Sequence, residues 1–337
     1  MFPQTQFTDP ASVEAWDCWF RWRERGVLRD LTIDQTWLRV ANAVASVEGA
    51  NAGKWARRFV DAFREWRFLP DPSLLRLAGT GEQLGDMASA TAVLNVAAFI
   101  RSPGTAHSDF DREGFTETVA LTVRLLDDVL LGDDEARRDG GLRIGLIGLA
   151  DAMHHLDLPY DSPAARQFAS HAAAALSEGA LQGATELARE RGAAEADRAT
   201  LAGRWHDRGA PASLVDEVLR CGMRHTRLTA IEAQPRLALL ANNASDALDP
   251  QLLELPAPLA SHRRGARVAV PMRAQLELRA AIQPWIDAPI DYPVVSATEP
   301  AADELESLRQ LARDHGLRPL TLRRARSHSL IDEGHEH

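Results

Sequence analysis

One long helix is the feature that most constrains the fold of this 337-residue chain. Ser162 offers a side-chain cap, and Pro163 has a backbone already suited to a first helical turn. Apolar residues then recur at three- and four-residue spacing, with Gly179 and Gly183 as small interruptions, until Gly192 offers a stop. We therefore predict a helix over residues 163–191, about 40 Å long, whose small apolar face suits close packing against other helices.

A glycine-rich run stands directly before this helix. It reads LRIGLIGLADAMHHLDLPYDS over residues 142–162, and we interpret it as a helical segment that ends in a Leu-Pro-Tyr-Asp-Ser turn. An Ala-rich surface helix, which many unrelated folds contain, would explain residues 163–191 alone. It does not explain the run before them.

Composition limits the class of protein. Hydrophobic residues make up 45% and charged residues 26% of the chain, as in globular proteins, which suits one large or two moderate domains. The sequence shows neither an apolar run of about 20 residues nor a secretory signal, so we expect a soluble, cytoplasmic protein without a membrane partner. A formal net charge of −10 opposes binding to nucleic acid, and the basic run over residues 318–326 is too short to reverse that.

Aromatic residues concentrate in residues 11–70, which we predict to be helical. Trp55, Phe59 and Phe63 follow helical spacing, and Pro70 ends the run. Such a stripe could be a base-stacking or cofactor surface, but large aromatic side chains more often form a packed core. We favour the core.

Several runs together resemble one enzyme family. The run RIGLIGLADAM…LPYDS is similar to RIGLGVMGLADAL…LGIPYDS, and FDREGFTETVALTVRLLDDV to FDWEGFRETVRLAVRFLDNV, with Asp128 where the family has Asn. WARRFVDAFREWRFLP is similar to WAERFYEAL…FRFLP. These family sequences belong to the large, catalytic subunit of ribonucleotide reductase, most closely its adenosylcobalamin-dependent class. The resemblance covers most of residues 40–325.

The resemblance implies a fold. It predicts a mainly helical α/β protein with an N-terminal helical segment in residues 1–76, a cut-down remnant of the family's ten-stranded barrel in residues 77–326, and a disordered tail in residues 327–337. Strands are expected near residues 91–96, 227–232, 292–296 and 319–322. A large middle section of the family is absent after the FLP motif, so a full ten-stranded barrel cannot be built from this chain.

The family's radical loop, N-P-C-G-E-Q, falls on residues 78–83. Thr80 then stands at the radical cysteine and Ala78 at the Asn, while Glu82 is retained; the AGTG run could equally match an earlier family run, LAGAG. The second redox cysteine falls on Ser89 when Asn95 is matched to the Asn of the family's CNLGSIN. A hydroxyl O–H bond is much stronger than a thiol S–H bond, so Thr80 cannot replace the cysteine.

The family's phosphate-binding turn, P-T-G-x-x-S, falls on Ala233, Gln234, Pro235, Arg236, Leu237 and Ala238. Neither Gly nor a hydroxyl remains there, and Pro235 removes a backbone donor. Arg236 could still meet an anion, but a solvated Arg without convergent donors is the favoured interpretation.

Other candidate residues give no site. His154 and His155 are adjacent rather than four residues apart, so we predict no metal site there. Cys18 and Cys221 match no CxxC or zinc spacing and indicate a thiol-packed core, with Cys221 as a buried small hydrophobe.

Three functions therefore stand as hypotheses. The leading one is a ribonucleotide-reductase-like protein without independent reductase activity, either an accessory or regulatory partner or a diverged binder. The second is an adenosylcobalamin-dependent reductase component that works with another chain, and the third is a structural homo-oligomer. The residues predict no cofactor, although the family uses adenosylcobalamin. The expected partner is a full-length ribonucleotide reductase or a second copy of the chain.

Overall fold

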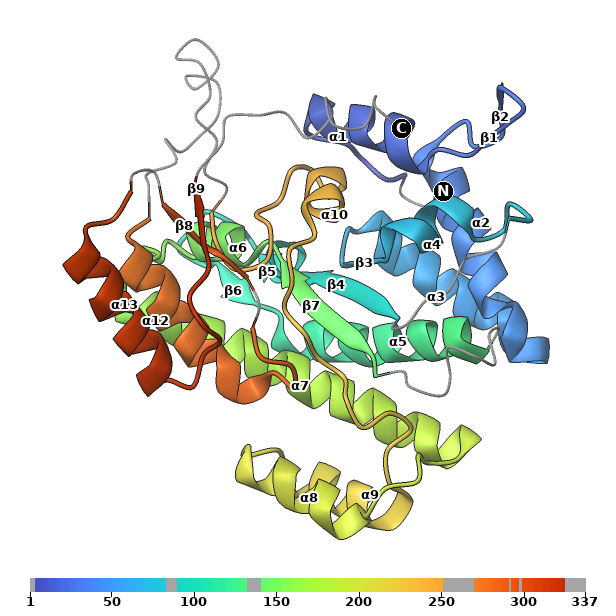
Figure 1. Cartoon of the computed structure of the whole chain (residues 1–337). Helices are drawn as coiled ribbons and strands as arrows, with labels where there is room; N and C mark the ends of the chain where they lie inside the picture. The colour runs from blue at the N-terminus through green and yellow to red at the C-terminus, as the bar shows by residue number, and fades with distance from the viewer. Residues whose placement is uncertain are drawn as a thin grey trace.

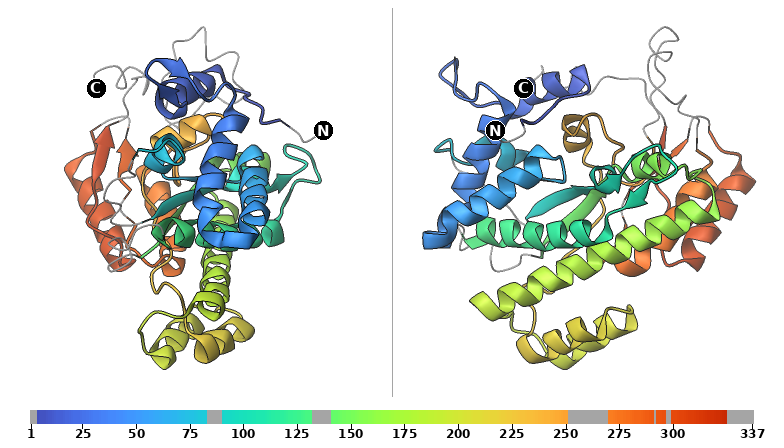
Figure 2. Two further views of the ribbon diagram at one scale, coloured as in Figure 1. Left: turned by 90° about the vertical axis from the view of Figure 1, so that its right-hand side faces the viewer. Right: turned by 180° about the vertical axis from the view of Figure 1, so that it is seen from behind.

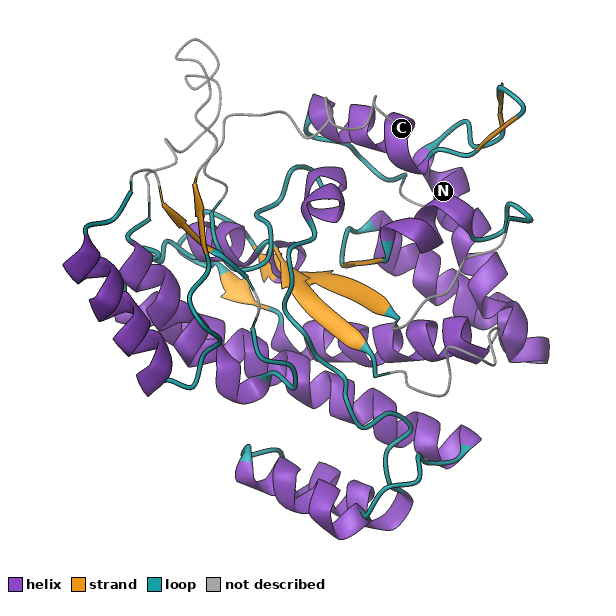
Figure 3. Ribbon diagram, in the orientation of Figure 1, coloured by secondary structure: helices purple, strands orange, loops and turns teal. Residues whose placement is uncertain are grey.

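Helices dominate the molecule and surround a few short strands (Figures 1 and 3). The computed structural model describes residues 4–82, 90–131, 141–250, 270–290, 292–296 and 299–324. Within these residues the strands form part of a barrel wall and no closed barrel. The predicted class, mainly helical α/β with a cut-down barrel, is confirmed.

The N-terminal part is a helical layer with an aromatic core. Its elements are α1 (Pro10–Ala15), the π-helical turn η1 (Trp16–Phe20), the hairpin β1 (Arg23–Glu24) and β2 (Val27–Leu28), α2 (Ile33–Ala45), η2 (Ser46–Asn51), α3 (Ala52–Arg64) and α4 (Pro72–Leu77). Trp37, Phe59 and Phe63 are fully buried, with the rings of Trp37 and Phe63 5.3 Å apart. Phe59 and Phe63 of the predicted stripe are therefore core, whereas Trp55, its first member, is half-buried.

The central sheet is formed by β3 (Phe68–Pro70), β4 (Thr91–Asn95) and β7 (Arg143–Ile147), in the order β3-β4-β7. β3 is antiparallel to β4, whereas β4 and β7 are parallel. A parallel bridge from Ile144 to Thr229 extends this wall by one further segment. A separate parallel pair, β8 (Val294–Ser296) and β9 (Leu322–Arg324), lies near the C-terminal helices (Figure 1).

Parts of the strand prediction were wrong. Residues 143–147 form a strand, not a helix, and they pair with β4. Ile144, Leu146 and Ile147 of this strand are fully buried. A strand buried on both faces has a continuous apolar run, which periodicity cannot distinguish from a buried helix. Residues 227–232 form only the bridge at Thr229, and the last strand begins at Leu322 rather than at residue 319. The strands predicted near residues 91–96 and 292–296 are present as β4 and β8.

The long helix predicted over residues 163–191 is α7 (Pro163–Arg191), and the Ser162 hydroxyl accepts the Ala165 N–H at 3.1 Å. It runs beside α5 (Arg112–Leu131) below the sheet (Figures 1 and 2). A Cβ atom at Gly179 would come within 2.5 Å of the Thr116 carbonyl, and one at Gly183 within 2.8 Å of Val123 Cβ. Only glycine at these two positions lets the helices approach so closely.

The remaining described elements complete the layers. They are η3 (Val96–Phe99), β5 (Ile100–Arg101), β6 (Asp109–Phe110), α6 (Leu149–His155), α8 (Arg198–Asp207), α9 (Ala212–Cys221), α10 (Pro235–Leu240), α12 (Met272–Ile282), η4 (Gln283–Trp285) and α13 (Ala302–Asp314). Helices α8 and α9 form a hairpin on the side of α7 away from the sheet (Figure 2). None of the described helices is both long enough and apolar enough to cross a bilayer.

One buried cluster joins the N-terminal aromatic residues to β4, β7, α5 and α7. A smaller cluster lies between α12, β8 and α13 and contains Met272, Leu276, Val294, Leu308 and Ala312. The domain boundary between residues 76 and 77 stays a prediction, and the tail over residues 327–337 lies outside the described residues.

Leu176 tests the packing of α7, because its side chain is fully buried. Replacing Leu176 with Asp should lower the free energy of unfolding by more than about 3 kcal/mol, since the variant buries an unpaired charge. Chemical denaturation followed by circular dichroism measures the change. Gln167, an exposed residue of the same helix, gives the control, because Gln167→Asp should change stability by less than about 0.5 kcal/mol. A similarly small loss for Leu176→Asp would contradict the packing.

Candidate functional site

Polar side chains gather at the carboxyl ends of the parallel strands β4 and β7, the end at which α/β barrels bind their ligands. Asn95 is the last residue of β4, Gly148 follows β7, and Ser245 comes from the segment after α10. The Gly148 N–H donates to the Ser245 carbonyl at 2.7 Å, and the Asn95 amide oxygen lies against Gly148, where a Cβ would clash with it. Three distant parts of the chain therefore meet at Gly148.

Two buried polar atoms in this place have no hydrogen-bond partner among the described residues. They are Asn95 Oδ1 and Ser245 Oγ, in side chains that are 6% and 1% exposed. The Ser245 backbone, by contrast, is held, because its N–H donates to Asp151 Oδ2 at 2.6 Å. Burying an unsatisfied polar atom costs about 1–3 kcal/mol, so these two atoms are suited to bind polar groups of a small ligand.

The predicted phosphate-binding turn is occupied by a carboxylate of the same chain. Gln234 caps α10, and its N–H donates to Asp246 Oδ1 at 2.7 Å. Burial raises the pKa of Asp246 to about 6, against the lowering effect of the Gln234 N–H. The Asp246 side chain thus stands where an anion would meet the turn.

Arg236 is held away from this place. It is exposed, and its guanidinium stacks on the Trp19 ring, 5.2 Å from the ring centre. Helix α1 packs on α10 next to it, where the Ser12 hydroxyl donates to the Leu239 carbonyl at 2.6 Å. The remaining positions of the turn, Ala233, Pro235 and Ala238, carry no side-chain donor.

A buried ion pair lies beyond Asp246. Arg279 of α12 pairs with Asp249 at 2.6 Å, and the two side chains are 3% and 5% exposed. The Tyr160 hydroxyl donates to the second oxygen of Asp249. Burial and the Asp249 charge raise the pKa of Tyr160 well above its ordinary value of 10.0, so Tyr160 remains a proton donor at neutral pH.

The predicted radical loop follows α4. The Thr80 hydroxyl donates to the Leu77 carbonyl at 2.7 Å and so closes the end of that helix. Glu82 is exposed, and the Ala78 carbonyl accepts from Arg39 Nη1 at 2.5 Å. Gln83 and Ser89 lie outside the described residues. Among the described residues, the hydrogen bonds of Thr80 and Glu82 are local, and neither residue bonds to the polar group around Gly148.

The cysteine prediction was wrong. Cys18 is exposed on the π-helical turn and Cys221 is half-buried at the end of α9, so neither packs in the core. Desolvation and then the nearby carboxylates of Asp17 and Glu14 raise the pKa of the Cys18 thiol. His154 and His155 end α6, and the described residues contain no group of three His, Cys, Asp or Glu side chains that could hold a metal ion.

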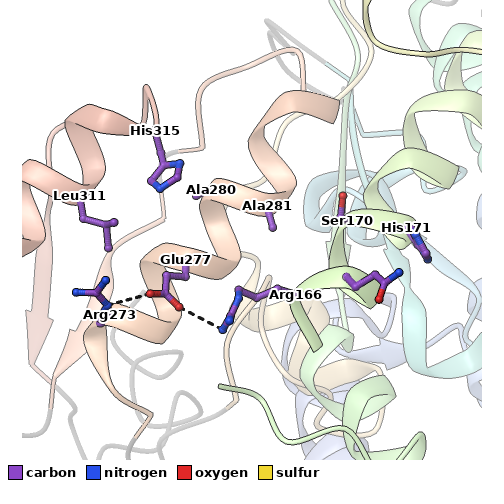
Figure 4. Close-up of a pocket in the computed structure, with 10 residues that line it drawn as sticks. Arg166, Ser170, His171, Arg273, Glu277, Ala280, Ala281, Leu311 and His315 are labelled. Atoms are coloured by element: carbon purple, nitrogen blue, oxygen red, sulfur yellow. Dashed lines mark hydrogen bonds and ion pairs between the residues drawn. The ribbon is translucent and has the colours of Figure 1, made fainter. Parts of the chain in front are cut away.

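A groove of about 590 Å³ lies elsewhere, between α7, α12 and α13 (Figure 4). Glu277 on its floor pairs with Arg166 of α7 at 3.2 Å and with Arg273 of α12 at 2.9 Å. His171 and His315 stand on opposite walls. The groove contains none of the site residues predicted from the sequence.

Part of the chain, including the strand-end site, is similar to a known protein family. Residues 87–254, which include β4, β7, α7 and α10, match the family model described as ribonucleotide reductase, barrel domain. Residues 87–254 are therefore similar to the ribonucleotide reductase barrel domain. The alpha subunits of ribonucleoside-diphosphate reductase from Chlamydia trachomatis serovar D and Chlamydia muridarum are each 31% identical to the chain over 110 residues.

The alignment with either relative covers 30% of this chain and 10% of the relative, so the matched region spans about a tenth of the relatives' length. The ribonucleotide reductase resemblance is confirmed at the level of the barrel domain. The adenosylcobalamin-dependent class and the proposed truncation stay predictions. The strand-end residues Asn95, Gly148 and Ser245 all lie within the matched range.

Sequence reasoning missed most of the strand-end group. Asn95 served only to align the chain, and Ser245, Asp246, Asp249 and Arg279 were not singled out. A signal was present, because the run NNASDALDP over residues 242–250 places several polar residues directly after the buried apolar end of α10. Buried polar residues in such a position are more often hydrogen-bonded in a site than solvated.

Asp246 gives a pH-dependent test. Because burial raises its pKa from 3.8 to about 6, its stabilising contribution is complete below pH 3.8 and is lost as the pH rises through 6. Asp246→Asn keeps an acceptor for the Gln234 N–H but cannot ionise. The variant should therefore be more stable than the wild type at pH 8, by roughly 1–3 kcal/mol, and nearly equal to it at pH 3.5. Denaturation at both pH values measures this; an equal difference at both would contradict the assignment.

Proposed function

We propose that this protein is a ribonucleotide-reductase-like protein without independent reductase activity, which acts as an accessory or regulatory partner or as a diverged small-ligand binder. The observation that carries the proposal is the Asp246 carboxylate on the N–H of Gln234. A carboxylate in this position repels a phosphate and satisfies the donor that would bind it. The chain's own side chain replaces the substrate's anionic group.

The chemistry of the radical loop supports the same proposal. Thr80 stands at the radical-cysteine position, and its hydroxyl is already bound to the Leu77 carbonyl. Both cysteines of the chain lie in other elements, Cys18 in η1 and Cys221 in α9. The residues around Gly148 thus supply no thiol to exchange hydrogen with a cofactor radical, and they do not fit the chemistry of adenosylcobalamin. We derive no step through that cofactor.

The second candidate, a reductase component completed by another chain, is favoured by Asn95 Oδ1 and Ser245 Oγ. These buried atoms have no partner among the described residues and lie at the ligand-binding end of the strands. Under this hypothesis a full-length ribonucleotide reductase contributes the missing cysteines. A homo-oligomer is the alternative partner. A pull-down with tagged protein distinguishes the two partners, because it recovers a full-length reductase only if the chain works with that enzyme.

The purified chain should not form deoxyribonucleotides from ribonucleoside diphosphates in the presence of adenosylcobalamin and a dithiol. The reason is the hydroxyl of Thr80 at the thiol position. Product analysis by chromatography measures this, with a known active reductase as the positive control. Product above background that disappears in Cys18→Ser or Cys221→Ser would overturn the proposal and identify the thiol involved.

Nucleoside diphosphates should bind weakly, with a dissociation constant in the millimolar range, about −4 kcal/mol. The expected cause is the Asp246 carboxylate on the predicted phosphate turn. Isothermal titration calorimetry on the wild type gives the affinity. Asp246→Asn, which removes the charge and keeps the hydrogen-bond acceptor, should bind more tightly, whereas Asp157→Asn, at an exposed position after α6, should not. Micromolar binding to the wild type would show that phosphate is held elsewhere.

A further inference from the structure

The two connections of the α8–α9 hairpin to the rest of the molecule meet at one carboxylate. We call these connections the roots of the hairpin: the first is Arg191, the last residue of α7, and the second is the Arg224-His225 pair that follows α9. Arg191 Nη1 pairs with Asp127 Oδ2, Arg224 Nε donates to Asp127 Oδ1 at 3.0 Å, and His225 Nε2 lies 2.7 Å from the same oxygen. Asp127 of α5 therefore holds both roots.

Asp127 belongs to a larger cluster of charged side chains, which we call the root cluster. Its members come from η2, α5, α7 and the segment after α9: Glu48, Arg124, Asp127, Asp128, Glu190, Arg191, Arg224 and His225. Most are buried, with Asp127 1% and Asp128 0% exposed, whereas Glu190 is 51% exposed. Arg124 also stacks on Trp55, 4.0 Å from the ring centre, which closes the cluster on the α3 side.

Arg191 is shared by three carboxylates. Besides Asp127 it pairs with Glu48 at 2.5 Å and with Asp128 at 2.8 Å. Glu48 has a second partner in Arg124, and Asp127 has Arg224 and His225. Among the described residues Asp128 forms an ion pair with Arg191 alone. Asp128 is fully buried, and neither of its carboxylate oxygens has a hydrogen bond among the described residues, so Asp128 is the member of the cluster for which a proton is the natural counter-charge.

A glycine with an unusual backbone conformation stands at each root. Gly192 and Gly222 have φ values of 90° and 75°, which place them in a region that residues with a Cβ rarely adopt. The two roots are tied to each other by a hydrogen bond from the Ala194 N–H to the Met223 carbonyl, 2.8 Å long. The far end of the hairpin is pinned separately, by Arg208 to Asp287 at 2.7 Å. Loosening the root cluster would therefore free the roots around a fixed far end.

We propose that Asp128 is a proton-controlled switch that holds the two roots of the α8–α9 hairpin when protonated and loosens them when ionised. An ionised Asp128 buries a further negative charge beside Asp127 and Glu48, and opening the cluster to water relieves the cost of desolvating that charge. The pair that fixes the first root then weakens. Arg224 and His225 share Asp127 with Arg191, so the second root loosens together with the first.

The direction of the pH response follows from burial. Desolvation is the largest effect on Asp128 and raises its pKa from 3.8 to about 7, against the lowering effect of Arg191; Glu48 adds to the rise and Arg124 opposes it. A raised pKa in the closed state means that the stabilising contribution is complete below pH 3.8 and is lost as the pH rises through 7. The roots should be closed in mildly acidic solution and loosened in mildly alkaline solution.

Hydrogen–deuterium exchange on the full chain tests the proposal, with rates corrected for the intrinsic effect of pH. Between pH 6 and pH 8 the protection of residues 189–196 and 221–226 should fall about tenfold, the change expected when one proton with a pKa of 7 is lost. In Asp128→Asn the protection should not change with pH. Asp207→Asn removes an 85%-exposed carboxylate on α8 and should keep the wild-type response.

Glu48→Gln gives an independent measurement, because it removes a neighbouring charge that raises the pKa of Asp128. The fall in protection should then move to lower pH. An unchanged pH response in both Asp128→Asn and Glu48→Gln would overturn the proposal. A loss of protection that spreads equally over α5 and β4 would also overturn it, since the proton would then stabilise the whole fold rather than the roots.

Discussion

The contact of α5 with α7 is the constraint on which the rest of the fold depends. Gly179 and Gly183 let the two helix backbones meet at distances that no side chain would allow. Helix α5 lies between β4 and β7 in the chain and packs on β3 and β4, so its position fixes α7 relative to the sheet. Helix α7 then supports α12 above and the α8–α9 hairpin below. Alanine at either glycine would force the layers apart and disturb all three.

The sequence predicts the elements that are regular and fails where burial overrides pattern. Helix α7 has a cap, a proline start and a stop that all agree, so its limits could be read residue by residue. The strand β7 has the same apolar content as a buried helix, and only its pairing with β4 distinguishes the two. Cys18 shows the converse, because a residue type that is usually buried lies on the outer face of a short π-helical turn.

The candidate site was predictable in part. Its phosphate turn could be located by resemblance, and the loss of donors there could be read from Pro235 and Ala238. The carboxylate that occupies the turn could not, because Asp246 reaches Gln234 across α10 from twelve residues later in the chain. The same holds for Arg279 and Asp249, which are thirty residues apart and meet only in the folded protein. Long-range polar pairs leave no local pattern.

The N-terminal arm has a consequence for how the chain is made. Thr8 N–H donates to the Asn242 side chain, the Asn243 side chain donates to Asp9, and Ser12 donates to the Leu239 carbonyl. These contacts join residues more than 220 positions apart, so α1 finds its place only after a much later part of the chain has been synthesised. Until α10 has been synthesised, the side of α1 that packs against Leu239 has no docking surface. During synthesis, α1 is therefore exposed to chaperones until α10 has been made.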